Sequence, residues 1–246
     1  MRIAQVSDCH LPASADVLYR GISAYKNLEL ILAKVADFSP DLLLATGDLS
    51  EDASPSSYSA LKRYFDTLGV DVLPVPGNHD EPQQVASIFP GSPVENLEVS
   101  DHGEWQIIRL NSCIDARPEG RVTEENLEQL ATLLRENPTR PRLLVLHHQP
   151  VLVGSPWIDK YRLQNPLELM SLVAACDGVK AVLWGHVHQA YSAQHGDTSL
   201  LAGPSSAING LPGKDKFTSD PQGPAFRWLE LYDGGRFETG ITWLAD

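Results

Sequence analysis

The chain has 246 residues, 42% hydrophobic and 21% charged, which is enough to bury a substantial core in a single domain spanning residues 1–246. The formal net charge of −13 argues against nucleic acid as a partner, because nucleic-acid binding needs an extended basic surface. No apolar stretch reaches membrane-spanning length, and the first residues predict a strand and not a secretory signal. The three cysteines lack disulfide-scaffold spacing, so we expect reduced thiols in a cytoplasmic protein that binds no membrane.

The N-terminal part of the chain alternates predicted strands with predicted helices. Residues 2–7, 41–46 and 71–75 are apolar runs of strand length. Between them, residues 21–38 and 56–68 carry apolar side chains at helical spacing. Strands that alternate with helices predict a parallel sheet covered by helices on both faces.

The middle of the chain continues this pattern. Residues 105–110, 142–146 and 179–184 predict further buried strands. Thr123 can cap a helix whose first turn contains two glutamates, and residues 167–176 predict a second, short helix.

The C-terminal part differs, because short runs there predict antiparallel strands. The hairpin signal Asp233-Gly234-Gly235 joins the last two of them. Residues 204–224 are rich in Gly, Pro, Ser and Lys and predict a long loop, which is usually functional or disordered. The four predicted strands are residues 190–195, 198–201, 226–232 and 236–243.

Five short polar motifs each follow an apolar run. In an open α/β sheet, ligands bind outside the carboxyl ends of the strands, so we expect the five motifs to form one site. Taken alone, each motif also fits an ordinary turn or a pair of surface histidines. Their joint placement at one sheet edge favours a common function. The motifs are Asp8-Cys9-His10, Gly47-Asp48, Gly77-Asn78-His79-Asp80, His147-His148 and Gly185-His186-Val187-His188.

The motifs offer seven imidazole, carboxylate and amide ligands, too many for one metal ion and suited to two. The carboxylate of Asp48 can bridge two ions, and the amide of Asn78 can bind a metal without adding charge. Two adjacent divalent ions suit phosphate-ester hydrolysis, because they can activate a water molecule and hold the phosphoryl oxygens. The seven candidate ligands are Asp8, His10, Asp48, Asn78, His147, His186 and His188.

Some titratable residues near the motifs receive other interpretations. His148 is expected to pack or to make a supporting hydrogen bond, since His147 comes first after its strand. Cys9 is expected to be a small packed residue, because alternation sends it away from Asp8 and His10. His102 and His195 lack partner motifs and are expected to be solvated.

The motifs resemble those of the calcineurin-like metallophosphoesterase superfamily, whose members carry Asp-x-His, Gly-Asp, Gly-Asn-His-(Asp or Glu), His and Gly-His-x-His in this order. The resemblance extends from residue 2 to about residue 243. It implies an α/β fold, a four-layer α/β/β/α sandwich with two mixed β-sheets. The finer resemblance is to bacterial class III cyclic-nucleotide phosphodiesterases of the cyclic AMP type. It rests on residues 45–49, 75–80, 146–150, 157–159 and 184–189.

The resemblance also implies a role for each motif residue. Asp8, His10 and His188 would bind one metal ion. Asn78, His147 and His186 would bind the other, and Asp48 would bridge them. A metal-activated hydroxide would attack phosphorus, and His79 would act as the catalytic residue that stabilises charge or protonates the leaving alkoxide. The ions would be Fe²⁺ or Mn²⁺, with Zn²⁺ as an alternative. The substrate would contact His10, Asp48, Asn78, His79 and His188.

The function expected from these features is hydrolysis of 3',5'-cyclic AMP to 5'-AMP. The alternatives are hydrolysis of another small diester, such as a glycerophosphodiester, and a non-catalytic metal- or nucleotide-sensing scaffold; a nuclease fits the acidic chain poorly. Lys214 and Lys216 on the long loop are candidates for binding the phosphate. A homo-oligomer is left open. The candidates for contact with the base are Trp157, Tyr161, Phe217 and Phe226.

Overall fold

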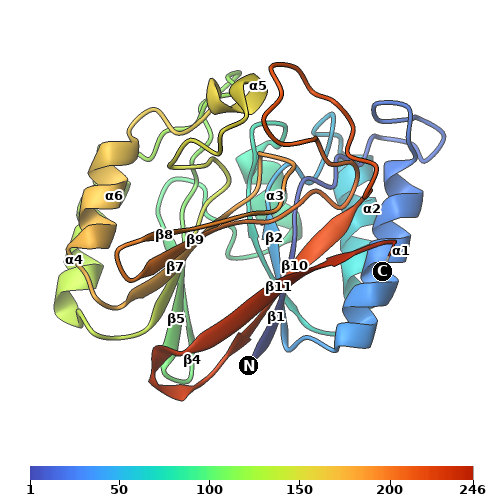
Figure 1. Ribbon diagram of the computed structural model, residues 1–246. Helices are drawn as coiled ribbons and strands as arrows, with labels where there is room; N and C mark the ends of the chain where they lie inside the picture. Colours follow the sequence, from blue (N-terminus) through green and yellow to red (C-terminus); the bar gives the residue numbers. More distant parts are fainter. Residues whose placement is uncertain (246) are drawn as a thin grey trace.

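Two β-sheets pack against one another at the centre of the computed structural model, which describes residues 1–245 (Figure 1). The interface between the sheets is an apolar cluster to which both contribute, including Ile3, Leu44, Ile107, Leu143 and Leu183. Two further apolar clusters lie on the outer faces, one under the helices of each sheet. The order of layers is therefore helix, sheet, sheet and helix, as expected for the α/β/β/α sandwich.

The first sheet combines the N-terminal strands with the C-terminal hairpin, in the order β11-β10-β1-β2-β3. β1, β2 and β3 pair in parallel, whereas β10 runs antiparallel to β1 and β11 antiparallel to β10. The sheet is mixed because the last two strands return beside the first. The strands are β1 (Arg2–Val6), β2 (Leu42–Thr46), β3 (Asp71–Val75), β10 (Ala225–Leu231) and β11 (Phe237–Trp243).

The second sheet has the order β4-β5-β6-β7-β9-β8. Its four inner strands are parallel, and β4 and β8 are antiparallel strands at the two edges. The strands are β4 (Glu98–His102), β5 (Trp105–Arg109), β6 (Arg142–Val145), β7 (Val179–Trp184), β8 (Tyr191–His195) and β9 (Thr198–Ala202).

Six α-helices are described in residues 1–245, and three of them begin at a side-chain cap. Ser23, Ser54 and Thr123 each accept a hydrogen bond from a backbone N–H in the first turn, which satisfies a donor that the helix itself leaves unpaired. None of the helices in residues 1–245 is long and apolar enough to cross a bilayer. The helices are α1 (Ala24–Phe38), α2 (Pro55–Asp66), α3 (Pro82–Ile88), α4 (Glu124–Glu136), α5 (Pro156–Asp159) and α6 (Pro166–Ala174).

The central strands are mostly apolar because both of their faces are covered, one by helices and the other by the other sheet, and not by helices on both faces as the alternation of strands and helices predicted. In β2, Leu42 and Leu44 point into the interface between the sheets, whereas Leu43 and Ala45 point toward the helices. The same alternation in β7 sends Leu183 to the interface between the sheets and the other face to the helices. Continuous apolar runs therefore correctly predicted buried strands.

The structure corrects three details of the sequence-based expectation. The first helix begins at Ala24 and not at Gly21, because Gly21 belongs to a tight turn. β9 pairs in parallel with β7 as well as antiparallel with β8, so it is not purely antiparallel. The strand β4 was not predicted, because its polar, half-exposed sequence is typical of an edge strand.

Candidate functional site

The five motifs converge at one edge of the two sheets. β1, β2, β3, β6 and β7 end at this edge, and the loops that follow them lie at the upper end of the view in Figure 1. Ligand atoms of Asp8, His10 and His188 lie within 4.8 Å of one another, as do those of Asp8, Asp48 and His147. The placement predicted from the strand ends is therefore confirmed.

The backbone at the motifs is held in an unusual conformation. Five motif residues have a positive φ: Asp8 (50°), His10 (44°), Asp48 (48°), His186 (64°) and His188 (49°). Within residues 1–245 only nine residues other than glycine adopt such angles. Each costs about 1–3 kcal/mol, and such strain collects where side chains must be aimed at a functional site.

Close approach requires glycine at several motif positions, including Gly77 and Gly185. A Cβ atom on Gly77 would overlap the backbone nitrogen and the carboxylate of Asp48. A Cβ atom on Gly185 would overlap the hydroxyl of Ser7 and lie 2.9 Å from the carboxylate of Asp8. These glycines therefore allow loops from both sheets to pack around the two aspartates.

The first group of candidate ligands is Asp8, His10 and His188. His188 Nδ1 donates to the carbonyl oxygen of Ile208 at 2.8 Å, and His10 Nδ1 donates to the Glu51 carboxylate at 2.7 Å. Both partners only accept hydrogen bonds, so in the neutral rings both Nε2 atoms carry lone pairs. Burial lowers the pKa of both histidines, to about 4 for His188, and so keeps the rings neutral.

The two lone pairs face each other, because His10 Nε2 lies 3.1 Å from His188 Nε2. His188 Nε2 also lies 3.4 Å from Asp8 Oδ1. Acceptors that approach this closely repel one another unless a cation lies between them. Each imidazole is oriented through its other nitrogen, as is typical of metal-binding histidines. The residues present therefore fit a metal ion.

The second group is Asn78, His147 and His186, next to Asp48. His147 Nδ1 donates to the carbonyl oxygen of Thr46 at 2.8 Å, while its Nε2 faces Asn78 Oδ1 at 3.2 Å and Asp48 Oδ1 at 3.4 Å. Burial opposes protonation of His147, but the negative charge of Asp48 prevails and raises its pKa to about 9. The group therefore attracts positive charge, either a proton or a metal ion.

His186 differs from the other candidate ligands because its Nε2 is buried without any hydrogen-bond partner in residues 1–245. Burial lowers the pKa of His186 well below its usual range, which leaves the ring neutral. Its backbone N–H donates to the carboxylate of Asp8 at 3.0 Å. A buried imidazole nitrogen without a partner is costly, and a metal ion would satisfy it.

His79 lies at the exposed side of the site. Its backbone N–H donates to Asp48 Oδ1 at 2.8 Å, and its Nδ1 lies 3.3 Å from the carboxylate of Glu51. Burial opposes protonation, but Asp48 and Glu51 raise the pKa of His79 above its usual value. His79 is thus placed beside the candidate ligands and toward solvent, where it can reach a bound molecule.

Two carboxylates near the site have roles that the sequence did not indicate. Glu51 contacts both His10 and His79; the only sequence signal for it is its spacing of three residues after Asp48. Asp80 points away from the ligands and accepts hydrogen bonds from the backbone N–H groups of Leu49, Ser50 and Gly77. Asp80 therefore joins the second and third motifs.

The interpretations of His148 and Cys9 agree with the structure. His148 is buried, and its Nδ1 lies 2.8 Å from the hydroxyl of Ser112. Its ring packs at 4.9 Å from the ring of His147 and at 4.7 Å from that of His186. Cys9 is fully buried in the apolar cluster under the first sheet's helices, and burial raises the pKa of its thiol to about 12.

The residues considered for contact with a base fall into different environments. Phe226 is 1% exposed in the core, which excludes it. Trp157 and Phe217 pack edge to face at 5.3 Å, and both rings lie near His188. Lys214 and Lys216 are exposed on the loop that carries Phe217.

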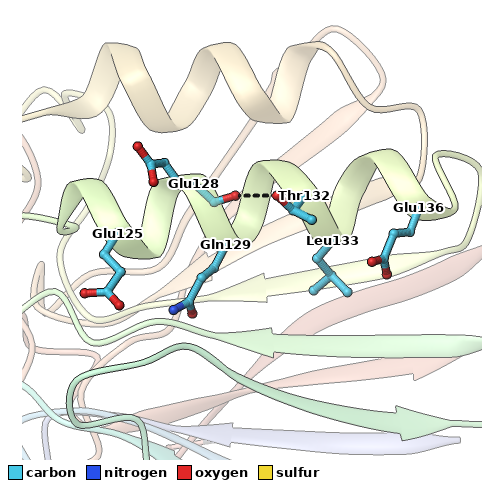
Figure 2. A pocket seen from close by; sticks show the side chains of 6 residues that line it. All are labelled: Glu125, Glu128, Gln129, Thr132, Leu133 and Glu136. Carbon is cyan, nitrogen blue, oxygen red and sulfur yellow. Dashed lines mark hydrogen bonds between the residues drawn. The ribbon is translucent and has the colours of Figure 1, made fainter.

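A separate hollow lies along α4 and contains none of the motif residues. Figure 2 shows its lining, which includes three glutamates, Glu125, Glu128 and Glu136. Thr132 donates a hydrogen bond to the backbone carbonyl of Glu128 within the helix. The like charges would repel a phosphate anion, so the hollow is unsuited to such a ligand.

Comparison with known proteins identifies the family. Residues 1–190 match the family model described as calcineurin-like phosphoesterase, and the chain belongs to this family. Its relatives include cyclic-nucleotide phosphodiesterases. The chain is 36% identical over 246 residues to the 3',5'-cyclic adenosine monophosphate phosphodiesterase CpdA of Pseudomonas aeruginosa, covering 99% of this chain and 90% of that protein. It is 35% identical over 241 residues to a 3',5'-cyclic-nucleotide phosphodiesterase of Nostoc, covering 97% and 91%.

Solved structures share the fold at low sequence identity. A dimetal phosphatase from Danio rerio matches with a TM-score of 0.74 and 13% identity, covering 97% of this chain and 98% of that one. A purple acid phosphatase from yellow lupin seeds matches with a TM-score of 0.67 and 15% identity, covering all of this chain and 52% of that one. The two-sheet sandwich predicted from the motifs is thus confirmed as the fold.

Proposed function

We propose that this protein is a metal-dependent phosphodiesterase that hydrolyses 3',5'-cyclic AMP to 5'-AMP. The observation that carries the proposal is the facing pair of imidazole nitrogens, His10 Nε2 and His188 Nε2, 3.1 Å apart beside the Asp8 carboxylate. The full-length similarity to enzymes named as cyclic AMP phosphodiesterases supports the substrate. The whole chain acts as one catalytic domain, its location is cytoplasmic, and neither nucleic acid nor membrane is a partner.

The candidate ligands form two sets that share one carboxylate. Asp8, His10 and His188 would hold the first ion, and Asn78, His147 and His186 would hold the second. Asp48 lies between the sets, 3.7 Å from His10 Nε2 and 3.4 Å from His147 Nε2, so its carboxylate would serve both ions. The mixed nitrogen and oxygen donors suit iron or manganese, and they also accept zinc.

When bound, two divalent ions would supply an activated water molecule and neutralise the charge of the phosphoryl oxygens. The protein's own residues do the rest. Thr46, Ile208 and Glu51 fix the imidazole rings through their Nδ1 atoms, so no reorganisation is needed when substrate arrives. His79 holds a proton at the exposed side of the site and donates it to the departing ribose 3'-oxygen. His10, Asp48, Asn78, His79 and His188 line the position of the phosphate.

Two variants separate catalysis from metal binding. His79→Ala removes the proton donor but none of the proposed ligands, so turnover of 3',5'-cyclic AMP should fall about 10²–10⁴-fold with metal content unchanged. Asp48→Asn removes the bridging charge and should lower both metal content and turnover. Metal content is measured by plasma mass spectrometry after dialysis, and turnover by chromatography of 5'-AMP.

The two variants also test the alternatives. Unchanged turnover in His79→Ala would refute its catalytic role. Stoichiometric metal without hydrolysis of any diester would favour a sensing scaffold. Preferred hydrolysis of a glycerophosphodiester by the wild-type protein would leave the metal proposal intact and replace the substrate.

A further inference from the structure

A pocket opens next to His79 on the rim of the site, and none of the base-contact candidates named from sequence lines it. Its wall is formed by the segment between β1 and α1, with Pro12, Leu18, Tyr19 and Arg20, together with Glu51 and His79. Its volume is about 310 Å³, at the lower end of the range for small-molecule sites. We call it the rim pocket.

The backbone places Arg20 at the tip of a tight turn above the site. The N–H of Tyr19 donates to the carbonyl of Ile22 and the N–H of Ile22 to the carbonyl of Tyr19, both at 2.9 Å. Arg20 and Gly21 between them have φ values of 49° and 85°, the pair of positive angles that a type I′ turn requires. Asn, Asp or Gly normally occupies the first of these positions, so arginine is held there at a cost in stability.

The side chain of Arg20 is oriented by aromatic contacts and not by an acid. Its guanidinium lies 4.3 Å from the ring centroid of Phe217, and its Nε donates to the Tyr19 hydroxyl at 3.0 Å. It has no ion pair with a carboxylate in residues 1–245. A planar cation without a counter-ion, held at the edge of a pocket, can stack on a flat ligand.

Each of the neighbouring aromatic rings already has one face covered. The ring of Tyr19 stacks on His10 at 4.2 Å with an interplanar angle of 10°. The ring of Phe217 is covered by Arg20 and meets Trp157 edge to face. The guanidinium of Arg20 has one face toward Phe217, and the side chain is exposed on the wall of the rim pocket, so its other face can stack on a base.

The proposed function indicates which side of the phosphate the nucleoside must occupy. Hydrolysis of 3',5'-cyclic AMP to 5'-AMP breaks the bond from phosphorus to the ribose 3'-oxygen, and the proton donor for that oxygen is His79. The ribose must then lie on the His79 side, and the base extends from it into the rim pocket that His79 and Arg20 both line.

We propose that Arg20 is a specificity-determining residue that stacks on the purine base of the substrate in the rim pocket. This inference rests on the proposed function for the direction in which the nucleoside extends. The apolar side chains of Pro12 and Leu18 contact the edge of the base. Phe217 holds the guanidinium in place from the adjoining loop.

The test compares ligands with and without the base. Binding of 5'-AMP and of ribose 5-phosphate to the manganese-loaded protein is measured by titration calorimetry for wild type, Arg20→Asn and Arg20→Lys. Asparagine favours the left-handed backbone at this position, so it removes the guanidinium without disturbing the turn. Lysine keeps the charge but not the plane. Arg63→Gln, which removes an exposed arginine near the distal end of α2, is the matched control.

Arg20→Asn and Arg20→Lys should weaken 5'-AMP binding roughly 5- to 100-fold, the range for loss of one stacked base, with ribose 5-phosphate binding unchanged. Arg63→Gln should change neither. Unchanged 5'-AMP binding in Arg20→Asn, or an equal loss for both ligands, would overturn the proposal. Wild-type affinity in Arg20→Lys would overturn it as well, because charge alone would then suffice.

The same experiment separates this inference from the proposed function. In one outcome, the wild-type protein hydrolyses no cyclic nucleotide and still prefers 5'-AMP to ribose 5-phosphate in an Arg20-dependent way. That result would refute the proposed function and support the role of Arg20. Hydrolysis of 3',5'-cyclic AMP by the wild type, with the full preference for 5'-AMP kept in Arg20→Asn, would support the proposed function and refute the role of Arg20.

Discussion

Removal of the metal ions should lower the stability of the protein by an amount that can be estimated from the site. Asp8 is fully buried and Asp48 is 2% exposed, and both lie among imidazole nitrogens that carry lone pairs. The ligands come from five segments that are brought together only in the folded chain, so the ions bind the native state selectively. An ion present at about 100 times its Kd then contributes about 2.7 kcal/mol to the free energy of unfolding.

Two such ions contribute about 5 kcal/mol together. For a domain of this size, 1 kcal/mol shifts the Tm by about 2–4 °C, so chelation should lower the Tm by about 10–20 °C. The assay is thermal unfolding followed by circular dichroism, first with excess EDTA and then with increasing Mn²⁺. Asp48→Asn should show a much smaller difference, whereas Asp37→Asn, which changes an exposed aspartate in α1, should show the same difference as wild type. A Tm that does not respond to chelator or Mn²⁺ would refute the reasoning.

Two further substitutions test the parts that support the ligands. Glu51→Gln keeps the shape of the side chain but removes the charge beside His10 and His79. Metal affinity or kcat/KM should therefore fall about 10–100-fold. Unaltered values of both would contradict this role of Glu51. Gly185→Ala would push a methyl group against Ser7 and Asp8 and should reduce the free energy of unfolding by about 1–3 kcal/mol, with weaker metal binding. Urea unfolding and calorimetric metal titration measure both effects; a stable Gly185→Ala protein with full metal affinity would show that the loops can move apart.

Much of the site could be predicted because its ligands follow apolar strands directly. A run such as residues 142–146 reads as a buried strand, so His147 is expected at its end whatever the rest of the fold. The choice of His147 over His148 as a ligand stays a prediction, supported by the contacts of His147 with Asp48 and Asn78 and by the hydrogen bond between His148 Nδ1 and Ser112.

Other features depend on contacts between distant segments, and no local pattern indicates them. Glu51 lies in a polar stretch, and its importance appears only when His10, 41 residues away in sequence, is placed beside it. Phe226 was considered for the base because it follows the long loop, but strand alternation turns it into the core. Its strand pairs with β1, a contact across most of the chain length.

The turn at Arg20 was hidden by an overlapping pattern. Ile22 and Tyr25 fit the apolar face of a helix, so the predicted helix was extended back to Gly21. In the structure the helix begins only after its N-cap, Ser23, and Arg20 and Gly21 form a turn above the site. Cap chemistry therefore outweighed periodicity at this boundary.

The most direct test of the central claim is steady-state hydrolysis of a panel of diesters by the purified protein loaded with Mn²⁺ or Fe²⁺. The panel contains 3',5'-cyclic AMP, 3',5'-cyclic GMP, 2',3'-cyclic AMP, a glycerophosphodiester and a chromogenic bis-phosphodiester. We expect the highest kcat/KM for 3',5'-cyclic AMP, 5'-AMP as the product, and loss of activity with chelator. No hydrolysis of any of these diesters by protein that holds two metal ions would contradict the proposed function.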